Sequence, residues 1–189
     1  MSAREEFVSI YRETLPVLLI ALGGGLVSGV VLENLLASVE RFPGLLVMVP
    51  VFLATRGNVY GALGGRLASG LHQGLIEPRF TWDERLVNAV VASFVNGIGI
   101  SVVIAVITRL ALAVLGWESA ALWEFLAIML ISGVLTSTVL IFGLLLVLFG
   151  GYKAGYDPDN LVGPIVTTLG DIFGMLFLVF AVTLVGVIP

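Results

Sequence analysis

The sequence predicts an all-α integral membrane protein with five transmembrane helices in each chain. Of its 189 residues, 59% are hydrophobic and only 12% are charged, whereas soluble domains carry about 25% charged residues. Long apolar stretches follow one another, each long enough to cross the hydrocarbon core of a bilayer. They cover residues 15–36, 45–71, 86–115, 122–149 and 160–188. Because four such stretches follow the first, we expect the first to be a membrane helix and not a cleaved signal.

The charges outside these stretches predict the domain organisation and the orientation. Residues 1–13 are polar and are expected to form a short cytoplasmic tail, and residues 14–189 a single membrane domain. An odd number of spans puts the two termini on opposite sides of the membrane. Arg4, Arg12, Arg79, Arg85 and Lys153 fall on one side, and Arg41 and Arg109 on the other. The positive-inside rule therefore predicts a cytoplasmic N-terminus and an external C-terminus in the cell membrane.

The composition excludes several classes of function. Without cysteine, the chain has no thiolate metal site, cysteine nucleophile or disulfide. His72 is the only histidine, so one chain cannot form a multi-histidine metal site, and we expect it at the membrane interface. The net charge of −4 and the lack of a basic patch argue against nucleic-acid binding.

The fifth span carries a polar stripe on an otherwise apolar helix. Asp159, Gly163, Thr167 and Asp171 recur at intervals of four residues and so share one helix face. An acid within a membrane helix is costly and ordinarily faces a bundle interior or a water-filled path. Asp171 is therefore the leading candidate for a functional site.

The second span has an unusual centre. Pro50 is expected to interrupt it, and Arg56, Gly57 and Asn58 follow. A glycine stripe then continues at intervals of four, through Gly57, Gly61 and Gly65 to Ser69. One interpretation is close packing against another helix. The other is a helix loosened near Gly57 and Asn58 whose backbone carbonyls line a path, which is tolerated only where that backbone is buried or borders a cavity. The two interpretations are compatible.

Depth and chemistry connect these two spans. At 1.5 Å per residue, Asp171 lies about 17 Å from the inner end of its span and Gly57 about 18 Å from the outer end of its own. Both are then near the middle of a hydrocarbon core of about 30 Å. Carboxylate, hydroxyl and carbonyl oxygens suit hard cations such as Mg²⁺. One carboxylate is few for a divalent ion, so a cation path predicts a homodimer with the second and fifth spans at its axis.

Hydroxyl groups of the fourth span, at residues 132–138, are expected to bond to their own backbone or to a neighbouring helix.

The order of residues in these two spans resembles a known family. Residues 49–58 read Val-Pro-Val-Phe-Leu-Ala-Thr-Arg-Gly-Asn, which is similar to the second transmembrane segment of MgtE-type magnesium channels and transporters. Asp157-Pro158, followed by Pro-Ile-Val-Thr-Thr-Leu-Gly-Asp at residues 164–171, is similar to the start of their fifth segment. Asp-Pro-Asp-Asn at residues 157–160 and Arg-Gly-Asn at residues 56–58 are closer still to the eukaryotic solute-carrier relatives of that family.

The resemblance implies a homodimer of five-helix domains with the pore at the dimer axis, and Mg²⁺ as the transported ion, not a catalytic cofactor. It implies that Asp171 is the main acid of the ion site and contacts hydrated Mg²⁺ through its water shell. The other path-lining residues would be Thr167, Gly163, Gly57, Asn58 and Gly61. Bacterial members usually have glycine where Arg56 stands and a polar amide where Gly61 stands. We therefore expect Arg56 to modulate the charge of the site, either by pairing with Asp171 when no ion is bound or by pointing to another depth. The family's cytoplasmic regulatory domains have no counterpart in these residues, so gating by them is not expected.

Three alternatives remain at the level of sequence. The first is transport of another cation, including Na⁺-coupled exchange. The second is a membrane subunit that transports nothing, which accounts for the glycine stripes but not for Asp171. The third is an intramembrane aspartyl protease using Asp157 and Asp171. Those acids are 14 residues apart on one helical run, about 21 Å, whereas a catalytic pair must share one proton, so we predict that the protein is not an enzyme.

Overall fold

The computed structural model describes residues 3–36 and 38–187, and α-helix is the only regular secondary structure in those ranges. Its helices are α1 (Ala3–Leu36), α2 (Leu45–His72), α3 (Glu84–Leu115), α4 (Leu122–Lys153) and α5 (Pro158–Val187). All five are long and apolar enough to cross a membrane, with the spanning part of α1 at Thr14–Leu36. The prediction of five membrane-length helices is confirmed, and each predicted boundary inside the described residues agrees within four positions. Residues 1–2 of the expected tail and residue 188 of the expected fifth span lie outside the described residues.

Local sequence explains where the helices begin and end. The side chain of Asp83 accepts hydrogen bonds from the backbone N–H groups of Arg85 and Leu86, both at 3.0 Å, and so caps the start of α3. Gly116 ends the same helix in the left-handed conformation, with φ of 70°, which glycine adopts at little cost. Asp157 caps α5 by accepting from the N–H of Asp159 at 2.9 Å.

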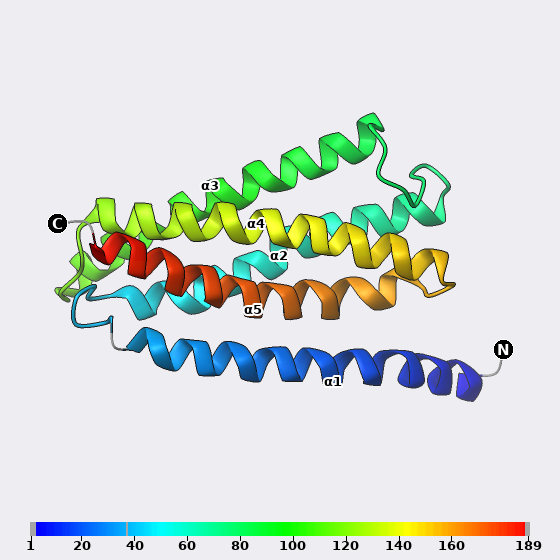
Figure 1. The fold of residues 1–189 in the computed structure, drawn as a ribbon, viewed down its shortest axis with the longest axis horizontal. Coiled ribbons are helices and arrows are strands. Elements are labelled where there is room, and N and C mark those ends of the chain that lie inside the picture. Colours follow the sequence, from blue (N-terminus) through cyan, green and yellow to red (C-terminus); the bar gives the residue numbers. More distant parts are fainter. Residues whose placement is uncertain (1–2, 37, 188–189) are drawn as a thin grey trace.

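The helices form an elongated bundle in which α1 lies along one side and packs on α5 (Figure 1). One end of the bundle holds the N-terminus, the α2–α3 connection and the α4–α5 connection. The other end holds the C-terminus, the α1–α2 connection and the α3–α4 connection. Helices α2 and α5 therefore run antiparallel, and the termini lie at opposite ends of the bundle.

The buried core consists of two apolar clusters with a polar layer between them. One cluster contains Phe52, Phe125 and Met175, and the other contains Tyr60 and residues such as Leu63, Leu144 and Val162. Along α2, α3 and α4 the residues between these clusters include buried polar side chains, namely Arg56, Ser101, Ser132, Thr136 and Ser137. The middle of the bundle is thus its most polar level.

The predicted interruption of the second span is wrong. Helix α2 is unbroken from Leu45 to His72, through Pro50 and through Gly57 and Asn58. Pro50 is only the sixth residue of the helix, so the single backbone bond it removes lies close to the helix start, and membrane helices tolerate such losses. Gly57 has no positive φ. The functional interest of this region therefore lies in the missing side chains of a regular helix and not in a break.

Candidate ion path at the α2–α5 face

Three glycines allow α2 and α5 to pack closely along their length. A Cβ atom added at Gly64 would collide with Val162, and one added at Gly174 would lie 2.9 Å from Cδ2 of Leu53. Between these two points, a Cβ at Gly170 would lie 3.8 Å from Cβ of Arg56. The two helices are antiparallel, so positions later in α2 lie against positions earlier in α5. Small residues at such positions let membrane helices approach closely.

This register brings the two predicted halves of the site to the same level. Gly57 follows Arg56 in α2, and Asp171 follows Gly170 in α5, and Arg56 and Gly170 are in contact. The matching depths that were expected from helix arithmetic are therefore found in the packing of the two helices.

The glycine stripe of α2 is open within the chain. A Cβ atom added at Gly57, Gly61 or Gly65 would have no atom of another part of the protein within 4 Å. Asn58 and Ser69 on the same side of α2 are exposed. Within one chain, a side chain at these three glycines would meet no described residue, so their bare backbone is available to another molecule or to a hydrated path.

The stripe on α5 is open as well. Gly163 and Thr167 are exposed and Asp171 is half-buried. The hydroxyl of Thr167 donates to the carbonyl of Gly163 at 3.0 Å, so its oxygen remains free to accept from a water molecule. The Asp171 carboxylate has no hydrogen-bond or ion-pair partner among residues 3–36 and 38–187. The stripe thus presents an unpartnered acid above a hydroxyl and a carbonyl oxygen.

Arg56 does not form an ion pair with Asp171 in the structure, and its side chain turns toward α3 and α4 at the level of the α2–α5 contact. The side chain is fully buried. One terminal nitrogen, Nη2, donates to the carbonyl of Gly97 at 2.8 Å and to Oγ of Ser101 at 2.9 Å. The other, Nη1, donates to Oγ of Ser137 at 3.2 Å. The guanidinium also lies over the ring of Phe52, at 4.7 Å from its centroid.

The environment of Arg56 leaves its positive charge without a carboxylate. Its partners are neutral acceptors and an aromatic face, and no described acid forms an ion pair with it. A buried charge is ordinarily paired, and Arg56 departs from this pattern behind the α2–α5 contact. Sequence reasoning identified Arg56 but missed Gly97 and Ser101 as the residues that hold it. Their spacing of four in the third span was the available signal.

Three hydroxyl groups of the fourth span bond as predicted, whereas the buried Oγ1 of Thr136 has no hydrogen-bond partner among the described residues. Ser132 donates to the carbonyl of Ile128 at 2.5 Å and Thr138 to that of Val134 at 2.8 Å. Ser137 instead accepts from Arg56 on the neighbouring helix. Ser132, Thr136 and Ser137 are buried within the bundle, whereas Thr138 is exposed.

Comparison with known proteins identifies the family of the chain. The sequence pattern of the MgtE family, described as divalent cation transporters, matches residues 49–181. The chain belongs to this family. The match includes Arg56, Gly57 and Asp171, and the family is one of transporters and not of enzymes. The resemblance seen in the sequence is therefore confirmed.

Curated relatives come from solute carrier family 41. The chain is 27% identical over 168 residues to member 3 from Rattus norvegicus, covering 84% of the chain and 35% of that protein. It is 25% identical over 141 residues to member 2 from Gallus gallus, covering 71% of the chain and 24% of that protein. The chain therefore matches only about a quarter to a third of the length of these relatives. No solved structure matches the chain significantly.

Proposed function

We propose that the protein carries a divalent cation, with Mg²⁺ as the principal ion, across the cell membrane along the open α2–α5 face. The observation that carries this proposal is the unpartnered carboxylate of Asp171 on the open stripe of α5, level with the bare stripe of α2. Membership of a divalent cation transporter family supplies the substrate class. An intramembrane acid without a partner is expensive unless it faces water or an ion.

The path is completed by a second copy of the chain. One open face cannot exclude lipid from a hydrated ion, whereas two faces related by a twofold axis enclose a channel between them. Two Asp171 carboxylates then face the same axis and supply the charge that a divalent ion requires. The bare backbone at Gly57, Gly61 and Gly65 lets the two copies approach while leaving room for water.

The ligand set suits an ion that keeps its water shell. Mg²⁺ dehydrates reluctantly and is commonly held through one or two carboxylates with several waters retained. In this proposal Asp171 accepts hydrogen bonds from those waters. The remaining contacts come from Thr167, Gly163, Asn58 and the α2 backbone at Gly57 and Gly61. The N-terminus faces the cytoplasm because the more basic end of the bundle belongs inside.

Arg56 acts on this site through its charge and not through contact. Ion conduction requires binding that is favourable enough to admit the ion and weak enough to release it. A fixed positive charge in a low-dielectric surrounding acts over a longer range than it does in water. Arg56 therefore lowers the affinity of the path for cations without occupying it.

The direct test is Mg²⁺ flux into liposomes that contain the purified protein and a trapped Mg²⁺-sensitive dye. We expect flux above that of empty liposomes for the wild type. Asp171→Asn, which keeps the shape and removes the charge, should lower it by about 10-fold or more. Glu84→Gln is the matched control because Glu84 is an exposed acid in the first turn of α3, away from this face. Absence of wild-type flux would contradict the transport proposal, and unchanged flux in Asp171→Asn would remove Asp171 from the site.

A further inference from the structure

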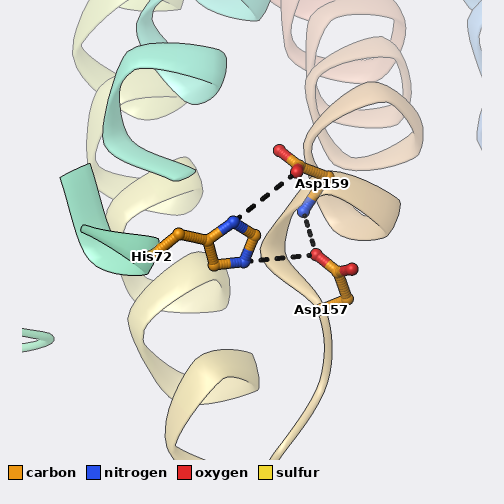
Figure 2. A group of neighbouring side chains, drawn as sticks. All are labelled: His72, Asp157 and Asp159. Carbon is orange, nitrogen blue, oxygen red and sulfur yellow. Dashed lines mark hydrogen bonds and ion pairs between the residues drawn. The ribbon is translucent and has the colours of Figure 1, made fainter. Parts of the chain in front are cut away.

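A second group of metal-ligating side chains lies at the end of the bundle where α2 stops and α5 starts (Figure 2). His72 is the last residue of α2, Asp157 precedes α5, and Asp159 is in its first turn. The ring nitrogen Nε2 of His72 lies 3.5 Å from Oδ1 of Asp157, and Nδ1 lies 3.8 Å from Oδ2 of Asp159. The cluster is separated from Asp171 by more than two turns of α5.

A cation would stabilise this arrangement of side chains. A neutral imidazole carries one N–H and one nitrogen lone pair, yet both ring nitrogens of His72 face carboxylate oxygens (Figure 2). A neutral ring would therefore set a lone pair against a carboxylate. Either a second proton on the ring or a metal ion shared by the three side chains removes that repulsion.

We propose that His72, Asp157 and Asp159 bind a divalent transition-metal ion of the Mn²⁺ or Zn²⁺ type. One ligand atom from each residue lies within 4.8 Å of the other two. Metal–nitrogen and metal–oxygen bonds of about 2.1 Å place ligand atoms roughly 3.0 to 3.4 Å apart, so only a small inward movement is required. The side chains are 43%, 49% and 64% exposed in the order given, so they are free to make that movement.

One of the two acids is already held in place. Oδ1 of Asp157, the oxygen that faces His72, also accepts the N–H of Asp159 at 2.9 Å, which fixes this carboxylate at the start of α5 and leaves a lone pair on the same oxygen for an ion. Three protein ligands leave further positions for water, as expected for an exposed site that exchanges its ion.

The chemistry of this site differs from that of the proposed ion path. Imidazole nitrogen suits Zn²⁺ and other transition metals, whereas Mg²⁺ prefers oxygen ligands alone. An ion bound here ties the last residue of α2 to the first turn of α5, the two helices that carry the path. The site does not rest on the proposed function, because ion binding is measured without transport.

The test uses the single histidine of the chain. The full chain is prepared without a polyhistidine tag and with ¹⁵N-labelled histidine, in the Asp171→Asn variant so that the path site does not contribute. Electron spin-echo spectroscopy of added Mn²⁺ should then show ¹⁵N coupling, which only His72 can supply. Titration of Mn²⁺ followed by its solution spectrum gives the affinity.

We expect the ¹⁵N coupling to vanish in His72→Gln and the Mn²⁺ affinity to fall by about 10-fold or more in both His72→Gln and Asp159→Asn. Glu84→Gln should leave both unchanged, because it removes an acid from the same end of the bundle but outside the cluster. Helix content measured by circular dichroism confirms that each variant is folded. Absence of ¹⁵N coupling in the parent protein, or unchanged affinity in folded His72→Gln, would overturn the site and assign the cluster to a protonated histidine.

Discussion

Gly170 lies directly against Arg56, with the position of its missing Cβ 3.8 Å from the Cβ of the arginine. This contact explains why Gly57 and Asp171 face the same side of the helix pair. Each successive residue of an α-helix is turned by about 100°. In two antiparallel helices that touch at residues 56 and 170, the residues that follow turn toward the same side of the pair. The contact therefore directs the bare position of α2 and the acid of α5 to a common face.

The open glycine stripe predicts a substitution that preserves the fold and blocks transport. Gly61→Leu adds a side chain where nothing lies within 4 Å, so thermal stability of the detergent-solubilised monomer should change by less than about 1 kcal/mol. In the proposed dimer the same side chain enters the path or the contact between copies, and Mg²⁺ flux should fall by about 10-fold or more. Normal flux in folded Gly61→Leu would contradict a path along this stripe.

A side chain at Gly64 is expected to have the opposite effect on the fold, which is a loss of stability. A Cβ atom there would collide with Val162, a stiff β-branched side chain on α5. Gly64→Ala should therefore destabilise the protein by about 1 to 3 kcal/mol, measured by reversible unfolding in mixed micelles. The double variant with Val162→Ala should recover most of that loss, because the space is restored. Additive effects of the two substitutions would show that the two helices do not pack as described.

Substitutions at Arg56 distinguish the effect of its side-chain volume from the effect of its positive charge. Arg56→Met fills most of the same volume, so it should leave stability near that of the wild type, since replacing a buried charge with an apolar group is often neutral or stabilising. Arg56→Ala leaves a cavity and should cost about 2 to 4 kcal/mol. Both variants remove the positive charge, and we expect faster or less selective cation flux from Arg56→Met.

Arg56→Lys serves as the control for charge, because it keeps the positive charge while losing the fork of donors to Ser101 and Ser137. It should retain wild-type selectivity. A folded Arg56→Met protein without flux would instead assign Arg56 a structural role in transport and would contradict its action as a distant charge.

The helices were predictable because each one is long and apolar, and the stripe through Asp171 was predictable because intervals of four residues define a helix face. The depth match of Gly57 and Asp171 followed from helix rise alone.

The continuity of α2 was not predictable, since Pro50 and Gly57 are breakers in soluble helices but are tolerated within a packed membrane bundle. The partners of Arg56 were also hidden, because they depend on how α3 and α4 rotate against α2, which no periodicity fixes. The cluster of His72, Asp157 and Asp159 joins residues 85 positions apart and depends on the same packing.

The charge asymmetry predicts the orientation of the chain. Because the wild type has no cysteine, single cysteines introduced at Gln73 and Glu118 report on the two ends without background labelling. Both positions are exposed and lie in or next to connections at opposite ends of the bundle. In intact cells, a membrane-impermeant maleimide should label Glu118→Cys and should label Gln73→Cys only after the membrane is permeabilised. The reverse pattern would place the N-terminus outside.

The proposed twofold axis predicts which positions meet between two copies. Asn58 is exposed on the open side of α2, so cysteines at this position in two chains should form a disulfide, or be joined by a short bifunctional maleimide, in the membrane. Ile107 is the matched control, because it is 58% exposed on α3 and does not lie on the α2–α5 face. We expect a cross-linked dimer for Asn58→Cys and little for Ile107→Cys, as measured by electrophoresis without reductant. Added Mg²⁺ should change the rate for Asn58→Cys, because an ion between two Asp171 carboxylates draws the open faces together. Efficient cross-linking through Ile107 with none through Asn58 would move the dimer contact to another face and leave Asp171 without a partner copy.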